Sequence, residues 1–130
     1  MLLYIALGSA LGGTARFLLS RASQSWWGGF GFPSGTLIVN IIGAFFVGFV
    51  IRYAIDTSAV SAEMRAFLTT GFFGGFTTFS AFSYETAAQI EDGNYKRALI
   101  YVLVSVLGCL LAVFAGFAGA RALAETLRGR

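Results

Sequence analysis

Neutral hydrogen-bond donors lie inside the apolar stretches of this 130-residue chain. They are the side chains of Asn40, Thr77, Thr78, Ser80, Tyr101 and Ser105. Each offers an N–H or O–H group without carrying a formal charge. Donors that face no carboxylate suit an anion, and neutral donors hold it weakly enough to let it leave again. The pattern therefore predicts an anion pathway.

Phenylalanines accompany these donors at a spacing of three residues, at Phe76, Phe79 and Phe82. A parallel face of hydroxyls is formed by Thr77, Ser80 and Tyr84. The edge of an aromatic ring carries partial positive charge, so a ring can meet an anion edge-on. Helix packing is the alternative for any single ring. Three rings in register beside hydroxyls favour contact with the anion.

The adjacent glycines Gly74 and Gly75 stand in the middle of an uncharged stretch, just before the hydroxyls. Glycine weakens a helix, and in lipid a weakened helix exposes carbonyl and N–H groups that need partners. Close packing through Gly71 and Gly75 is the competing interpretation. The hydroxyls that follow favour a break at the glycine pair. A sodium ion could satisfy several freed carbonyls at once, particularly on a dimer axis.

Four apolar segments must position these groups. Hydrophobic residues make up 57% of the chain and charged residues 12%, against about 25% in an average soluble domain. The composition predicts one all-α membrane domain over residues 1–130, with four transmembrane helices of which the third is broken. The expected spans are residues 2–21, 33–52, 66–85 and 98–120. Residues 22–34 are expected to form a loop, residues 85–97 a charged turn, and the residues after 120 a frayed tail.

Several function classes are disfavoured by what the sequence lacks. It has no histidine and one cysteine, which removes histidine-based triads, common metal ligands and a disulfide framework, so an enzyme is not expected. The net charge of +3 is scattered over loops and the C-terminus, which indicates membrane-flanking charge and no nucleic-acid partner. All acids are expected in loops or at span ends, which argues against a proton-coupled carrier. They are Asp56, Glu63, Glu85, Glu91, Asp92 and Glu125.

The basic residues are nearly balanced between the two sides of the membrane. One side carries Arg52, Arg65, Arg121, Arg128 and Arg130; the other carries Arg21, Lys96 and Arg97, with Arg16 just inside the boundary. Because lysine and arginine asymmetry sets orientation, a balanced chain can insert both ways up. The count predicts an antiparallel, dual-topology homodimer in the bilayer. Arg16 is either an interface anchor or a charge in an ion vestibule.

Three motifs, in order on three expected helices, carry a resemblance to a known family. They are Gly12-Gly13-Thr14-Ala15-Arg16-Phe17, Gly35-Thr36-Leu37-Ile38-Val39-Asn40 and the run from Gly71 to Phe82. Together they resemble the bacterial Fluc fluoride channels. The resemblance implies passive fluoride export across the inner (plasma) membrane, a dual-topology dimer with two pores, and a structural sodium ion at the dimer centre.

The same resemblance implies roles for individual residues. Carbonyls of Gly74 and Thr77 would coordinate sodium, and the ring edges of Phe79 and Phe82 would meet fluoride. The polar side chains of Asn40 and Ser80 would be pore donors. Thr78, Tyr101, Ser105 and Arg16 complete the expected fluoride pathway.

Two other classes share the length and the four spans. A small proton-coupled multidrug antiporter would need an acid inside the first span, and none stands there. An inert membrane assembly subunit needs no pore. Ion flux into liposomes separates the three classes.

Overall fold

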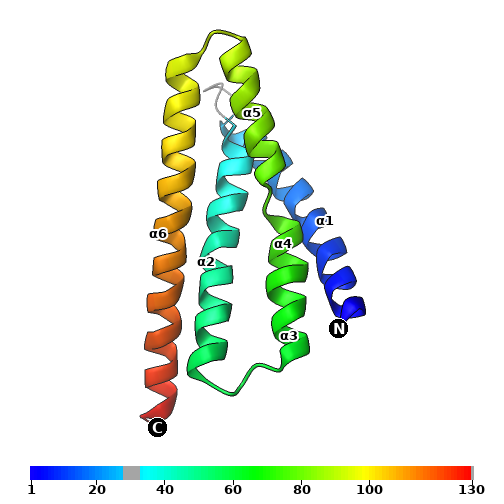
Figure 1. The fold of residues 1–130 in the computed structure, drawn as a ribbon, viewed down its shortest axis with the longest axis vertical. Coiled ribbons are helices and arrows are strands. Elements are labelled where there is room, and N and C mark those ends of the chain that lie inside the picture. The colour runs from blue at the N-terminus through cyan, green and yellow to red at the C-terminus, as the bar shows by residue number, and fades with distance from the viewer. Residues whose placement is uncertain (28–32, 130) are drawn as a thin grey trace.

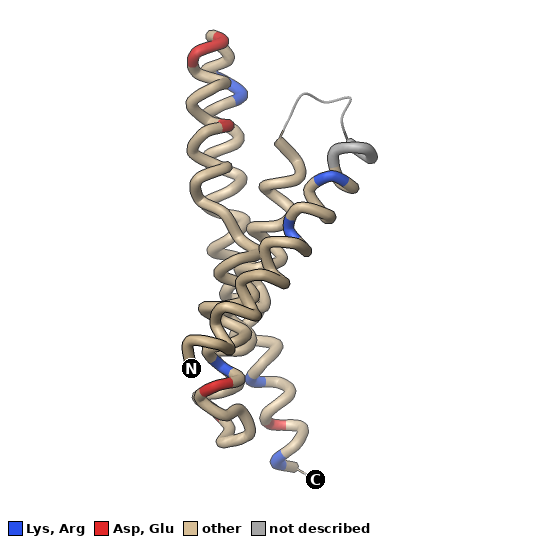
Figure 2. The backbone as a smooth tube through the Cα atoms, turned by 90° about the vertical axis from the view of Figure 1, so that its right-hand side faces the viewer, with Lys and Arg blue, Asp and Glu red and all other residues tan. Residues whose placement is uncertain are grey.

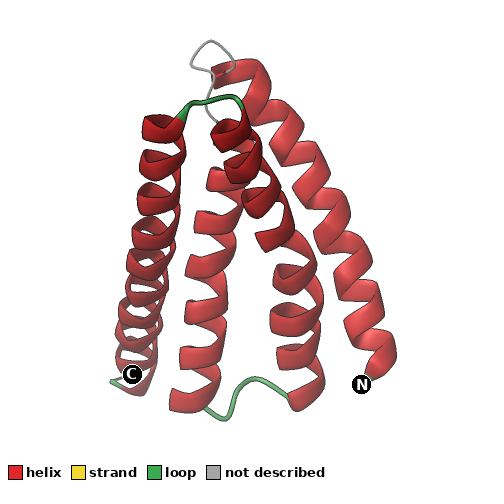
Figure 3. Ribbon diagram, turned by 45° about the horizontal axis from the view of Figure 1, so that its top comes forward, coloured by secondary structure: helices red, strands yellow, loops and turns green. Residues whose placement is uncertain are grey.

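A computed structural model describes residues 1–27 and 33–129 as a bundle of helices, with no strand among them. Three helices are long and apolar enough to cross a membrane: α1 (Leu2–Trp27), α2 (Ser34–Asp56) and α6 (Tyr95–Arg128). The helices run side by side, and α6 lies along α2 (Figures 1 and 3). The all-α prediction is confirmed.

The remaining crossing, third in chain order between α2 and α6, is assembled from pieces. It begins with α3 (Ala62–Ala66), continues through a π-helical segment (Phe67–Phe73) into α4 (Gly74–Phe76), and resumes after an interruption as α5 (Phe79–Glu91). Figure 1 shows α5 stacked above α4 along one path. The prediction of a broken third membrane helix is therefore confirmed. Wide helical turns of the π type are frequent at functional sites.

Both chain termini and the α2–α3 connection lie at one end of the bundle, and the α5–α6 turn lies at the other (Figure 1). Charged residues gather toward these two ends (Figure 2). An even number of crossings requires this arrangement. Most basic residues of the described part therefore lie toward the two ends, as the sequence predicted; Arg16 lies in the middle of α1 instead, and Arg130 lies outside the described residues.

Three predicted boundaries are wrong. The helix α1 continues to Trp27, so residues 22–27 are not loop, and residues 28–32 lie outside the described part. Helix α5 continues to Glu91, which confines the expected charged turn to residues 92–94. Helix α6 continues to Arg128, because Ala120 and Ala124 remain 0% and 3% exposed in the packed bundle. In each case polar residues interrupt the apolar pattern, but the helix continues through them.

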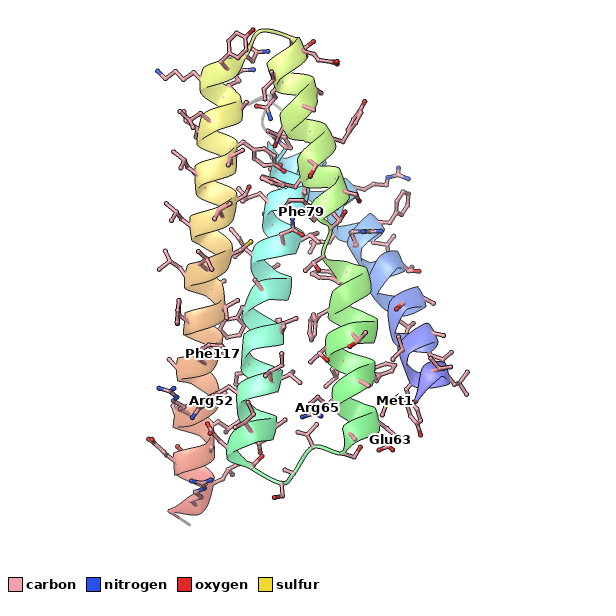
Figure 4. All side chains as sticks on the ribbon, viewed as in Figure 1. Met1, Arg52, Glu63, Arg65, Phe79 and Phe117 are labelled. Atoms are coloured by element: carbon pink, nitrogen blue, oxygen red, sulfur yellow. The ribbon has the colours of Figure 1, made fainter. Side chains whose placement is uncertain are left out.

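Small residues allow the helices to approach closely. A Cβ atom on Gly116 of α6 would lie 2.2 Å from the Phe45 carbonyl oxygen of α2. A Cβ atom on Gly75 would lie 2.7 Å from the Ser9 carbonyl oxygen of α1. The packing role of Gly75 is thus real, as the competing interpretation held. Around these contacts Val39, Phe73 and Phe76 form the buried core, while many large apolar side chains of α1 and α6 face outward (Figure 4).

The neighbouring glycines of α1 give a matched test of this packing. A Cβ atom on Gly12 would lie 2.0 Å from the Phe72 carbonyl oxygen, whereas one on Gly13 would meet nothing within 4 Å. We expect Gly12→Ala to lower the free energy of unfolding by about 2 kcal/mol, because α1 must move away from the third crossing. Gly13→Ala should leave it unchanged or raise it slightly. Unfolding in mixed micelles measures both, and equal effects would contradict the close approach.

Candidate functional site: the break between α4 and α5

The backbone leaves helical geometry at two residues, Thr77 (φ −80°, ψ 159°) and Thr78 (φ −151°, ψ 115°). The break thus falls three residues after Gly74, which itself is helical (φ −64°, ψ −39°). The prediction that the glycine pair forms the break is wrong in position. What ends the helix is a set of side chains that take over the backbone hydrogen bonds.

Asn40 of α2 supplies two of these bonds. Its Oδ1 accepts from the Thr78 backbone N–H at 2.8 Å, and its Nδ2 donates to the Thr78 carbonyl at 3.0 Å. The side chain therefore pairs with an extended residue much as a neighbouring strand would. One Nδ2 hydrogen remains, because the amide carries two. Asn40 is half-buried and fixes the break to α2.

The hydroxyl of Thr78 caps the next helix. Its Oγ1 accepts from the Ala81 backbone N–H at 3.1 Å and lies 3.0 Å from the Ser80 hydroxyl oxygen. This is the usual arrangement of a threonine that precedes the first turn of a helix. Its contribution to helix stability is about 1 kcal/mol.

Because the side chains of Asn40 and Thr78 accept these two backbone N–H groups, two backbone carbonyls lose their usual helical donors. In a continuous helix the Thr78 N–H would donate to the Gly74 carbonyl, and the Ala81 N–H would donate to the Thr77 carbonyl. Both N–H groups donate to side chains instead. Gly74 is also exposed on the surface of the single chain. The Gly74 and Thr77 carbonyls, which the family resemblance implies as sodium ligands, are thus among the carbonyls before the break that lose their helical donors.

Arg16 lies beside the same break. Its Nη1 is 3.4 Å from the Thr77 carbonyl oxygen, a long hydrogen bond from α1. The residue also lines an open hollow of about 550 Å³ together with Ser80, Tyr84 and Glu85. Arg16 is half-buried in the middle of α1. Arg16 therefore places a positive charge at the wall of this hollow, beside the break.

A second hollow, of about 350 Å³, lies on the other side of the break. Its wall carries Asn40, Thr77, Thr78, Phe79, Phe82, Ser105 and Cys109, together with four aliphatic residues. No charged residue is among the lining residues. Thr78 lines both hollows, so the two hollows adjoin at this extended residue. Most of the predicted pathway residues are therefore brought to this one place.

The rings of Phe79 and Phe82 are neighbours at the start of α5. Their centroids are 5.5 Å apart with planes tilted by 44°, and the Phe82 ring lies 5.3 Å from that of Tyr101. Phe79 is 79% exposed and lies beside the break (Figure 4). Phe82 is half-buried. In the single chain, the Phe79 ring is therefore exposed, whereas the Phe82 ring is partly covered.

Two predicted alignments are wrong because the break interrupts them. Phe76 is 6% exposed in the core before the break, so it does not continue the ring pair of α5. Thr77 also precedes α5, and its Oγ1 donates to the Phe73 carbonyl at 2.9 Å. The face of hydroxyls on α5 therefore contains Ser80 and Tyr84 only.

Glu85 is not a turn residue. It is half-buried within α5 and accepts hydrogen bonds from Thr36 Oγ1 and from the Tyr101 hydroxyl, each at 2.6 Å. The expectation that every acid lies in a loop or at a span end is wrong here. The Tyr101 hydroxyl, counted as a donor for the anion, is engaged with this carboxylate. Ser105, 6% exposed one turn later on α6, faces the hollow of about 350 Å³.

Comparison with known proteins agrees with this geometry. Residues 3–117 match the family model described as CrcB-like protein, Camphor Resistance (CrcB). The chain belongs to the CrcB family. Two relatives, both named fluoride-specific ion channel FluC, come from Geobacter sulfurreducens (48% identical over 94% of this chain and 98% of the relative) and Geobacter metallireducens (47% over 90% and 94%). A third of that name, from Hydrogenovibrio crunogenus, is 44% identical over 88% of this chain and 86% of the relative.

Two polar residues of the site in this CrcB-family chain, Thr36 and Glu85, are not predicted by the sequence as partners of one another. The sequence predicts no separate role for Thr36, and it predicts a turn at Glu85. A signal for Thr36 exists, since it precedes Asn40 by four residues and so shares its helix face. Nothing in the charge pattern marks Glu85, because its partners come from two other helices.

Proposed function

We propose that this chain is a fluoride-specific ion channel of the inner membrane, through which fluoride leaves the cytoplasm passively so that its toxicity falls. The names of the relatives support fluoride as the ion. The observation that carries the proposal is the uncharged hollow of about 350 Å³, in which amide, hydroxyl and ring-edge donors meet. A small anion can replace its water there without meeting a fixed charge.

The geometry supports distinct roles for the pathway residues. Arg16 attracts the anion into the open hollow that Ser80 also lines. The remaining N–H of Asn40 and the hydroxyl of Ser105 then serve as donors in the uncharged hollow, and Thr78, which lines both hollows, marks the passage from one to the other. Phe79 and Phe82 present ring edges to the ion. The Tyr101 ring packs against Phe82, and its hydroxyl donates to Glu85, which also accepts from Thr36 of α2.

An efflux measurement on purified protein tests the function. Liposomes loaded with fluoride should lose it through the protein electrogenically, without a proton gradient, while chloride-loaded liposomes retain their anion. Flux that requires a proton gradient would favour the antiporter class, although α1 carries no acid. A protein that assembles but passes no ion would be the inert subunit. Either result would overturn the channel.

We propose further that two copies assemble in antiparallel, dual-topology orientation. The 79% exposure of Phe79 supports a second copy that completes the ion path. A cysteine placed at the C-terminus, after removal of the single native thiol at Cys109, should react with impermeant reagents on both faces of the membrane. Labelling from one face only would contradict this orientation.

A structural sodium ion fits the residues of the break. The carbonyls of Gly74 and Thr77 lose their helical donors, and carbonyl oxygens are ligands that hard cations accept. In an antiparallel dimer, each copy would contribute its pair around the shared axis. When bound, sodium would supply positive charge to these carbonyls and so hold the two breaks together.

Sodium removal therefore has an expected result. Prolonged dialysis against a buffer whose only cation is a large organic ion should abolish fluoride flux, and added sodium should restore it. Thermal unfolding of the dimer gives a second measurement, since sodium that binds only the folded dimer must raise its midpoint. Full activity and an unchanged midpoint after dialysis would show that Arg16 and neighbouring groups satisfy the break without a cation.

A further inference from the structure

The ends of α2 and α6 enclose a small charged hollow, about 160 Å³ in volume, that the proposed ion pathway does not use. Its lining residues are Arg52, Asp56, Arg121, Ala124, Glu125 and Arg128. Arg52 follows Asn40 by twelve residues on α2, roughly 18 Å along the helix axis. In Figure 4 Arg52 lies near the end of the bundle that holds the C-terminus, well away from Phe79. Figure 2 shows basic and acidic residues mixed at this end.

The helix extension that the apolar pattern did not predict creates this hollow. Ala120 and Ala124 are buried, so α6 stays packed beyond its apolar part. The packing brings the last turns of α6 beside the end of α2. There the Arg128 guanidinium donates to the Asp56 backbone carbonyl, and Arg52 Nε lies 2.7 Å from Asp56 Oδ2.

The hollow keeps spare capacity for an anion. Three guanidinium groups face two carboxylates, so the lining carries a formal net charge of +1. Asp56 is occupied by Arg52 and Arg128. Among the described residues, the Arg121 side chain makes no hydrogen bond or ion pair, and it is exposed. Because each guanidinium has five N–H donors, many remain free for a ligand.

The position of the hollow relative to the membrane identifies the class of ligand. The apolar part of α6, residues 98–120, is roughly 35 Å long, which is close to the hydrocarbon thickness of about 30 Å. Arg121 therefore stands where lipid phosphates lie. Exposed apolar side chains on the same turns of both helices are available to acyl chains: Ile51, Ile55, Leu123 and Leu127.

We propose that this hollow binds the headgroup of an anionic glycerophospholipid, of the phosphatidylglycerol type. Arg121 and Arg128 hold the phosphate, because the planar guanidinium pairs with phosphate oxygens through two parallel hydrogen bonds. The Glu125 carboxylate accepts from the glycerol hydroxyls. The exposed isoleucines and leucines favour a lipid over free phosphate, since they contact only a ligand that brings acyl chains.

A lipid-binding measurement on the intact protein tests this proposal. The probe is short-chain phosphatidylglycerol, titrated into protein in detergent and followed by native mass spectrometry and by the thermal midpoint. Arg121→Gln is the test variant, since the residue is exposed and holds no other part of the fold. Arg97→Gln is the matched control, because it removes the same charge from an exposed position at the opposite end of α6.

We expect Arg121→Gln to weaken phosphatidylglycerol binding about tenfold, the loss that corresponds to one charge-assisted hydrogen bond. Arg97→Gln should bind as the unmodified protein does, and phosphatidylcholine should bind weakly to all three. Equal affinity for phosphatidylglycerol in both variants would overturn the site. Glycerol phosphate that binds as tightly as the lipid would overturn the lipid as occupant and identify a soluble anion instead. Fluoride flux of Arg121→Gln without added lipid should be unchanged, so the result is independent of the proposed channel function.

Discussion

Asn40→Asp should reduce fluoride flux by about a thousandfold while the protein still assembles. The new carboxylate keeps the acceptor for the Thr78 N–H, whose present length is 2.8 Å, so the break retains that bond. The aspartate lacks the donor to the Thr78 carbonyl and the second amide N–H, at a residue that lines the hollow. A fixed negative charge about 4 Å from the anion costs on the order of 4 kcal/mol at an effective dielectric constant of 20.

Asn94→Asp is the control for this substitution. Asn94 stands in the exposed turn before α6 and its side chain makes no capping hydrogen bond, so the same chemical change there meets neither the break nor the hollow. Its flux should equal that of the unmodified protein. Unchanged flux in an assembled Asn40→Asp protein would show that Asn40 acts only as a structural partner of Thr78.

The helical architecture was predictable because few backbone structures are stable in lipid. A backbone inside the membrane must satisfy its own hydrogen bonds, so uncharged stretches of about 20 residues indicate helices without any knowledge of their neighbours. The interruption of the third crossing was also predictable from Gly74 and Gly75. Its position was not, because glycines show where a helix is weak, whereas Asn40 from another helix decides which N–H groups leave it. Thr78 gave a readable signal, as a threonine directly before a helical turn.

The polar partners of the site show the limit of sequence reasoning more clearly. Glu85 reads as surface charge in a single sequence, since it opens a run of acidic and basic residues. In the structure Thr36 and Tyr101 enclose its carboxylate from two sides. Such a triplet depends on how three helices rotate about their axes. Hydrophobic periodicity is too weak on helices that are apolar nearly all round to fix that rotation.

Phe82→Ile should reduce fluoride flux per assembled protein by about tenfold or more. Isoleucine keeps an apolar side chain at the wall of the hollow of about 350 Å³, but it removes the ring edge that carries partial positive charge. A tenfold loss corresponds to about 1.4 kcal/mol in the barrier to conduction. The ring also contacts Phe79 and Tyr101, at centroid distances of 5.5 and 5.3 Å, so some stability should be lost as well.

A packing control separates these two effects. Phe46 stacks on Phe73 with centroids 5.4 Å apart and is 43% exposed, yet it is not among the residues that line the hollow. Phe46→Ile should therefore cost a similar amount of stability, about 1–3 kcal/mol, with normal flux per surviving protein. Flux and unfolding are measured on the same preparations. If Phe82→Ile behaved as Phe46→Ile does, with stability lowered and flux per protein retained, the ring of Phe82 would be a packing element and the ion would pass without touching it.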